Sequence, residues 1–151
     1  MGKKKQFCTF YLGDCLYGFP VEEVQEVIHE QAITHVPLAP AVVRGLINLR
    51  GKIVTVIDLR KRLGLDAELQ ASPEMNLVVR NDESTVSFLV GPVGDVVTVE
   101  KTAFEELPEP VRNESSKAVV GVYKLPSGLL HVLDAQYSAQ IEGVKTRELR
   151  D

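Results

Sequence analysis

Short apolar runs rich in β-branched residues recur along the chain, and glycine, proline or polar clusters separate them. Such runs fit a pleated, half-buried surface better than a helix. Alternation and turn residues together predict strands at 7–12, 15–20, 46–49, 53–57, 75–80, 85–90, 118–125 and 129–133. Helical spacing is confined to short pieces, so the pattern predicts an all-β fold with few short helices.

The segment 45–63 organises the rest of the chain. Its two apolar runs flank Arg50 and Gly51, where glycine supplies the backbone freedom that a tight turn needs. Asp58 follows the second run, and its carboxylate suits the free N–H groups of a helix start. Gly64 is placed to end that helix. The segment is therefore predicted to form strand, turn, strand and short helix, with Arg50 at the turn.

The two halves of the chain carry the same pattern. Three valines spaced by three residues recur at an offset of 69, namely Val21, Val24, Val27 and Val90, Val93, Val96. A glycine and an aspartate thirteen residues apart also recur, namely Gly45, Asp58 and Gly121, Asp134. Units of roughly 70 residues, about 7–65 and 75–140, are too long for a solenoid repeat. They predict two small, closed or nearly closed β-barrels, because closure removes unpaired strand edges.

The repeat also predicts the core. Equivalent strands of the two halves are expected to contribute the core residues Ile53, Val54, Val56, Ile57, Leu129, Leu130, Val132 and Leu133. Among the repeated valines, Val21 and Val90 are expected in the core. Parts of the later valines are expected to reach the surface.

Composition excludes several classes of partner. The 151 residues carry a formal net charge of −4 with a pI near 5.4, which argues against nucleic acid. No apolar run approaches the roughly 18 residues of a membrane span, so direct membrane insertion is not expected. The start of the chain has no apolar signal region or cleavage site. We therefore expect a cytoplasmic protein in which residues 1–151 form a single domain, or two small ones that share a core.

No catalytic or metal-binding constellation stands out. The three histidines, His29, His35 and His131, are scattered and lack partners at ligand spacing. Cys8 and Cys15 at best face each other across the first hairpin, and a structural role is the default interpretation. Ser127 lacks a nucleophile elbow and a placed base. We expect neither an enzyme nor a bound cofactor or metal, and Arg50 is the charge least like a random surface residue.

Three ordered stretches carry a family resemblance: FYLGDCLYGFPVEEVQEVI, ITHVPLAPAVVRGLINLRG and IVTVIDLRKRLGL. They resemble the CheW family of chemotaxis coupling proteins, and weaker similarity continues through Phe88–Val99 and Ala118–Leu133. The resemblance implies one CheW-like domain made of two intertwined, five-stranded β-barrel subdomains around a shared hydrophobic junction. It also implies a non-catalytic scaffold that couples the histidine kinase CheA, through its regulatory domain, to the cytoplasmic tips of chemoreceptors.

The resemblance assigns candidate binding residues for receptor or kinase. They are Val24, Glu26, Val27, Gly45, Asn48, Arg50, Val93 and Val96. Asn48 and Arg50 are expected beside a receptor-facing groove, which a residue bulkier than Gly45 would obstruct. The valines would supply apolar surface near the subdomain junction. A cytoplasmic protein of this kind is recruited to membrane-bound receptor arrays, and ring assembly with CheA is compatible with it.

Two departures from the family pattern are visible. Thr55 replaces a common proline, and Gly91-Pro92 stands where Asp-Gly is frequent, which leaves the contact surface of the second valine segment open. An adaptor for a different chemosensory-type pathway stays open as an alternative function. An unsuspected enzyme is the remaining class, and the missing constellation argues against it.

Overall fold

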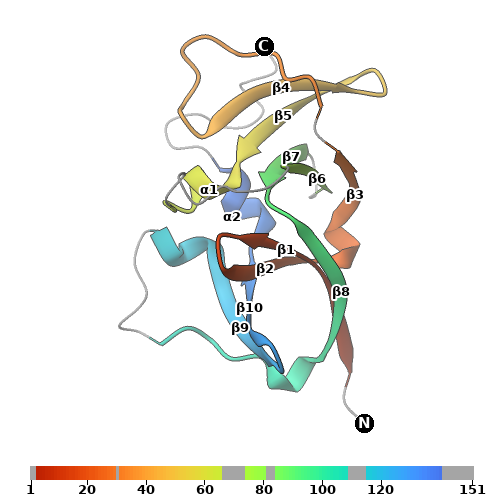
Figure 1. Ribbon diagram of the computed structural model, residues 1–151, viewed down its shortest axis with the longest axis vertical. Coiled ribbons are helices and arrows are strands. Elements are labelled where there is room, and N and C mark those ends of the chain that lie inside the picture. Colours follow the sequence, from red (N-terminus) through yellow and green to blue (C-terminus); the bar gives the residue numbers. More distant parts are fainter. Residues whose placement is uncertain (1–2, 30, 66–73, 81–83, 109–114, 141–151) are drawn as a thin grey trace.

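The computed structural model describes residues 3–29, 31–65, 74–80, 84–108 and 115–140. Ten strands dominate this part of the chain (Figure 1), and they are β1 (Lys4–Leu12), β2 (Cys15–Pro20), β3 (Val24–His29), β4 (Val43–Leu49), β5 (Lys52–Asp58), β6 (Met75–Arg80), β7 (Thr85–Val90), β8 (Val93–Glu100), β9 (Val119–Leu125) and β10 (Gly128–Leu133). Short helices connect them: η1 (Val21–Glu23), α1 (Leu59–Arg62), η3 (Lys101–Ala103), η5 (Ser115–Ala118) and α2 (Ala135–Ala139). The predicted all-β class is confirmed.

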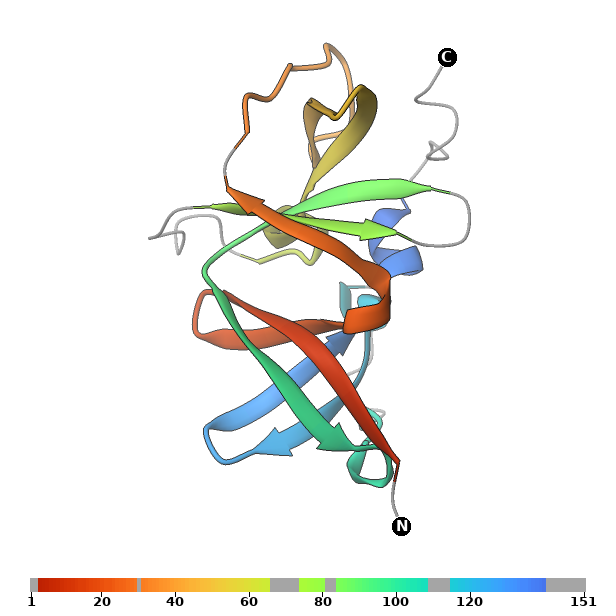
Figure 2. The same cartoon turned by 90° about the vertical axis from the view of Figure 1, so that its right-hand side faces the viewer.

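The strands form two five-stranded sheets, and each sheet contains strands from both repeat units. The first barrel has the strand order β8-β1-β2-β10-β9, and the second barrel has the order β3-β6-β7-β5-β4. Each barrel therefore takes a hairpin from one repeat unit and three strands from the other. Replacing each strand of the second barrel by its repeat equivalent reproduces the order of the first. Figure 2 shows the two barrels stacked along the long axis.

The largest apolar cluster lies at the junction of the two barrels. Phe10 and Phe19 of the first barrel share it with Phe88 of the second, and all three side chains are fully buried. The rings of Phe19 and Phe88 stack across the junction with centroids 5.2 Å apart. Each barrel also has a smaller interior cluster of its own. The two barrels are therefore held together by a common core.

Equivalent turns and bulges support the repeat in detail. In the second barrel a bulge separates the pairs Val43–Ile57 and Gly45–Val56, and the first barrel has the same irregularity before Gly121. A Cβ on Gly45 would overlap Thr34, and a Cβ on Gly121 would overlap Phe104, each in a neighbouring segment of the same chain. Glycine is therefore needed at both sites because another segment passes against the strand.

The predicted helix caps are present in both halves. The side chain of Asp58 accepts a hydrogen bond from the Lys61 amide at 3.2 Å. Asp134 accepts from the Gln136 amide at 2.9 Å, and so begins α2 in the same way. Gly64 follows α1 with φ of 74°. Each cap satisfies backbone donors that the short helix leaves free.

Most of the predicted core residues are buried, but two are not. Ile53 is 65% exposed and Leu129 is 47% exposed, although the residues that follow them, Val54 and Leu130, are buried. The parallel pairing of β5 with β7 begins only at Thr55, and that of β10 with β2 begins only at Leu130. Both residues therefore lie where a hairpin projects beyond the adjacent strand. Position in the sheet, which alternation alone does not give, explains both corrections.

The expectation for the two cysteines is also corrected. Cys8 pairs with Phe19 and Cys15 pairs with Leu12, so the two cysteines do not face each other across the hairpin. Both are free thiols, and burial raises the pKa of Cys8. A raised pKa keeps the thiol protonated, which agrees with a structural role for Cys8.

Candidate protein-binding surface

The valine spacing is explained by a bulge at the same place in each half. In a regular strand, residues three apart point to opposite faces. In β3, however, Val24 pairs with Val79 and Val27 pairs with Leu77, because the register shifts between them. The bulge thus returns Val24 and Val27 to one face of β3, the face shared with the buried residues Leu77 and Val79 of the junction cluster.

Strand β8 repeats this arrangement. Val93 pairs with Phe10 and Val96 pairs with Cys8, again with a register shift between the two pairs. Val93, like Val24, packs against the junction cluster. Val96 is 55% exposed and Val27 is 38% exposed. The first valine of each strand, Val24 or Val93, therefore packs against the junction between the barrels. The second, Val27 or Val96, carries the apolar surface out to solvent.

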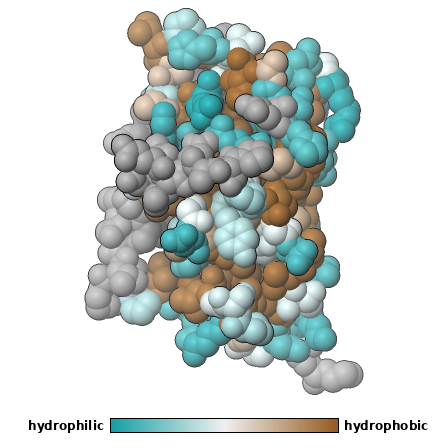
Figure 3. Space-filling model, viewed as in Figure 1, coloured by the Kyte–Doolittle hydropathy of each residue, from teal (hydrophilic) through white to brown (hydrophobic). Residues whose placement is uncertain are grey.

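We call the apolar surface formed by these four valines the seam. It consists of the exposed Val27 of β3 and Val96 of β8 and of the half-buried Val24 and Val93. Figures 1 and 2 place β3 and β8 on the same side of the molecule. Figure 3 shows apolar side chains gathered on that side at mid-height. Four of the eight predicted binding residues therefore lie on these two strands, and two of them, Val24 and Val93, pack against the same junction cluster.

Val90 and Val21, the first valines of the two triplets, have different environments. Val90 is buried in the junction cluster, as expected. Val21 is half-buried and belongs to η1, just before β3. The expected core position of Val21 is therefore wrong, because the residue lies in a three-residue helical turn that precedes the strand.

Arg50 and Glu26 form an ion pair beside the seam. Nη2 of Arg50 donates to Oε1 of Glu26 at 2.7 Å, and Nη1 donates to the second carboxylate oxygen, Oε2. The hydrogen bonds from Arg50 lower the pKa of Glu26, so the carboxylate stays ionised. Glu26 pairs with Val78, which puts it on the face of β3 opposite to Val27. The pair and the valines therefore lie on the two faces of one edge strand.

A tight turn positions the Arg50 side chain. Arg50 and Gly51 join β4 to β5 and have φ of 52° and 86°, the signs of a two-residue type I′ hairpin turn. Oδ1 of Asn48 accepts a hydrogen bond from the Gly51 amide at 2.9 Å and closes the turn. Asn48 is exposed, but its amide oxygen is used locally. It therefore positions Arg50, whose side chain is 70% exposed.

Gly45 contributes by packing. It is buried with φ of 147°, a conformation that favours glycine. Leu46 and Thr34 exchange two backbone hydrogen bonds of 2.8 Å directly beside it. A side chain at Gly45 would displace the segment that contains Thr34. Its predicted link to a groove is therefore indirect, through the position of that segment.

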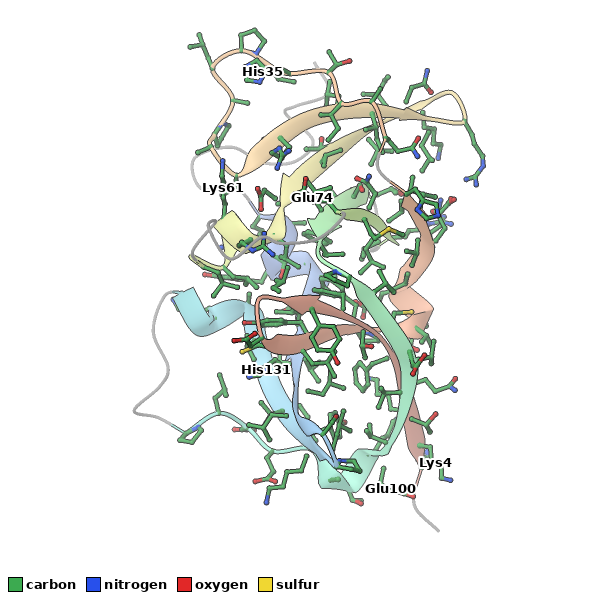
Figure 4. The ribbon with its side chains drawn as sticks, in the orientation of Figure 1. Lys4, His35, Lys61, Glu74, Glu100 and His131 are labelled. Atoms are coloured by element: carbon green, nitrogen blue, oxygen red, sulfur yellow. The ribbon has the colours of Figure 1, made fainter. Side chains whose placement is uncertain are left out.

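A second polar group escaped sequence reasoning. Nη1 of Arg44 lies 3.3 Å from Oδ2 of Asp58 and 3.5 Å from Oε2 of Glu74. Figure 4 shows Glu74 beside β5. The register of β4 and β5 could have suggested the Arg44–Asp58 contact, whereas Glu74 comes from a distant segment. This group ties the start of β6 to the organising hairpin.

Neither a metal site nor a membrane-spanning helix is found in the described ranges. No three side chains among His, Cys, Asp and Glu are grouped there as a metal site would require. His35 and His131 lie in different barrels (Figure 4). Among the residues described, no helix has the length and apolar character needed to cross a bilayer.

Comparison with known proteins gives one family. The family model described as "CheW-like domain" matches residues 6–141. The chain is 30% identical over 128 residues to the chemotaxis protein CheW of Helicobacter pylori, covering 85% of this chain and 77% of the relative. It is 32% identical over 132 residues to CheW of Bacillus subtilis, covering 87% and 84%. The crystal structure of scaffolding protein TtCheW from Thermoanaerobacter tengcongensis superposes with a TM-score of 0.85 at 28% identity, over 95% of this chain and 97% of that one.

Proposed function

The chain belongs to the CheW family of chemotaxis scaffold proteins, and from that premise we propose that it couples a CheA-type histidine kinase to chemoreceptors. In this proposal the protein is non-catalytic and holds two partners at separate surfaces. It acts in the cytoplasm, at the cytoplasmic tips of membrane-bound receptor arrays.

The observation that carries the proposal is the seam. Val27 and Val96 reach solvent from two edge strands through equivalent bulges, and neither exposure is needed to close a barrel. A receptor tip is a helical hairpin, and a helix binds by placing its apolar face on such a surface. Valines suit this role because their stiff side chains lose little conformational freedom on binding.

The ion pair supplies a polar component on the other face of β3, the edge strand that carries Val27. Arg50 is held in a planar, two-bond contact with Glu26, yet most of its side chain remains exposed. A guanidinium oriented in this way can donate further hydrogen bonds to carboxylates or carbonyl oxygens at a helix end. We assign the receptor contact to the seam together with Arg50.

The kinase contact is assigned to a different surface. Because the regulatory domain of CheA resembles this protein, we propose that barrel end meets barrel end. This arrangement leaves the seam free for the receptor, so that one small protein can hold both partners at once.

Formation of a three-component complex tests the proposal. A receptor-tip fragment should be retained by an immobilised CheA regulatory domain more strongly when this protein is added. Titration of each partner separately should give binding to both. A protein that binds only one partner, or whose two partners compete, would contradict the coupling role.

A further inference from the structure

Leu38 is an apolar side chain that the fold leaves in solvent. Its relative exposure is 103%, the highest among the exposed large apolar side chains of the described residues. It lies in the segment between β3 and β4, which crosses the end of the second barrel farthest from the first barrel (Figures 1 and 2). Single exposed leucines are common, so exposure alone carries no function.

The backbone at Leu38 is also unfavourable for leucine. Its φ is 65°, in the left-handed region where glycine and asparagine are the usual residues. The Ala39 amide donates to the Val36 carbonyl at 3.3 Å and closes a four-residue turn around Pro37 and Leu38. Proline in the second position and a positive φ in the third define a type II turn, whose third position is normally glycine or asparagine.

The fold therefore gains nothing from leucine at this position. An asparagine would adopt the same backbone conformation with less strain and would leave no apolar side chain in water. Strained, exposed residues of this kind are concentrated at sites of recognition, where another requirement outweighs the loss of stability. Leu38 is best explained by a partner that buries it.

The charge of the surrounding segment indicates what kind of surface would bury Leu38. Residues 31–65 contain six lysines and arginines but a single acid, Asp58, in a chain whose net charge is −4. Arg44 and Arg50 are paired with carboxylates and Arg60 is buried, so the remaining positive charge comes from the exposed Lys52 and Lys61 and the half-buried Arg62. Figure 4 shows the exposed His35 on the crossing segment and the exposed Lys61 on α1, on the side of the barrel that this segment borders. A complementary surface would be apolar at its centre and acidic at its rim.

We propose that Leu38 is an anchor that inserts into an apolar, acid-rimmed pocket on the CheW-like domain of the kinase. The proposal rests on the coupling function above, and it names a residue for the second surface which that function requires. A receptor helix on the seam, between the two barrels, leaves the far end of the second barrel free. A single apolar side chain buried in a partner's pocket can dominate an interface.

Three variants test the anchor. Leu38→Asn removes the apolar side chain and suits the turn, Leu38→Met keeps an apolar side chain, and Ala41→Asn changes an exposed neighbour on the same segment. Each variant is titrated against the isolated kinase regulatory domain and against a receptor-tip fragment. The thermal midpoint and the sedimentation behaviour of each are measured in parallel.

We expect Leu38→Asn to melt at or above the wild-type temperature, because it relieves the turn. Its affinity for the kinase domain should fall about tenfold or more, as for a central anchor residue, with receptor affinity unchanged. Leu38→Met and Ala41→Asn should bind both partners within about threefold of wild type, as surface changes outside an anchor do.

Normal kinase binding by Leu38→Asn would overturn the anchor. So would an equal loss of receptor binding, or a self-association of the wild type that Leu38→Asn abolishes while kinase binding persists. A wild-type protein that binds no kinase domain would instead contradict the coupling function itself. The two failures are therefore distinguishable.

Discussion

The two halves of the chain build equivalent strands, but among the described residues an ion pair beside the bulged strand is found in the first half alone. Glu26 and Arg50 of the first half correspond to Asp95 and Pro126 of the second. Pro126 cannot pair with a carboxylate, and the second hairpin tip is a Pro126-Ser127 turn. The shared bulges, glycines and caps serve folding, and the shared valines form the seam. In our proposal, the ion pair of the first half adds a polar contact that the second half does not repeat.

The comparison predicts unequal effects at the two bulge glycines, and these are the largest changes expected. Gly45→Ala must accommodate both φ of 147° and an overlap with the Thr34 backbone. We expect a loss of about 2–4 kcal/mol in unfolding free energy, from strain added to displaced packing. Gly121→Ala meets the Phe104 ring and the Glu105 carbonyl without a positive φ, and should lose less. Urea unfolding of both variants checks the order, and equal losses would contradict it.

The two helix caps should also differ. Asp58 is 6% exposed and is paired with Arg44, whereas Asp134 is exposed. Asp58→Ala removes a helix cap and also the ion pair between Asp58 and Arg44. We therefore expect the free energy of unfolding to fall by about 2–3 kcal/mol. Asp134→Ala should lose about 1 kcal/mol, the usual value for a cap alone. A larger loss at Asp134, measured by denaturant unfolding, would reverse this interpretation.

Arg50 should affect binding more than folding. Its side chain is mostly exposed, so Arg50→Ala should change the thermal midpoint by less than about 2 °C. Affinity for a receptor tip should fall about fivefold or more, and Arg50→Lys should restore it only in part because a lysine lacks the planar fork. Ser127→Ala, at the equivalent turn of the second half, is the matched control. Unchanged receptor binding by Arg50→Ala would remove Arg50 from the recognition surface.

The smallest effect concerns protonation of Glu26. Hydrogen bonds from Arg50 lower the pKa of Glu26 in the folded protein, so the pair is fully formed above the ordinary glutamate pKa, about 4.3. Its contribution is lost as the pH falls below that value and through the lowered pKa. Carboxyl-carbon NMR titration should give a lower midpoint for Glu26 in the wild type than in Arg50→Ala. Identical midpoints would show that the pair does not persist in solution.

Much of the fold could be predicted because local signals and the repeat agree. The β-branched runs predicted the strands, and the spacing from Gly45 to Asp58 predicted a hairpin followed by a capped helix. Ile53 and Leu129 were misplaced because exposure there depends on where a neighbouring strand begins. The exchange of hairpins between barrels is likewise a long-range property, which a local pattern does not encode.

The candidate site was only partly predictable. The valine triplets indicated related surfaces, but the bulges that align residues three apart come from strand register. The contact between Glu26 and Arg50 joins residues 24 positions apart, and alternation gives no sign of it. The signal for Leu38 was present in the sequence, since a turn with Pro37 in its second position favours glycine or asparagine next. It becomes visible only once the turn type is known.

A glutamate on the seam tests the central claim most directly. In Val96→Glu, receptor binding would force a carboxylate to lose water without a partner, at a cost of several kcal/mol. Val120→Glu is the matched control, because Val120 is similarly exposed on β9, an edge strand outside the seam. Both variants are melted to confirm folding and titrated against the receptor tip and the kinase regulatory domain. The account predicts that Val96→Glu loses the receptor alone, whereas Val120→Glu keeps it. Loss of both partners from folded Val96→Glu, or normal receptor binding by it, would contradict separate surfaces on one scaffold.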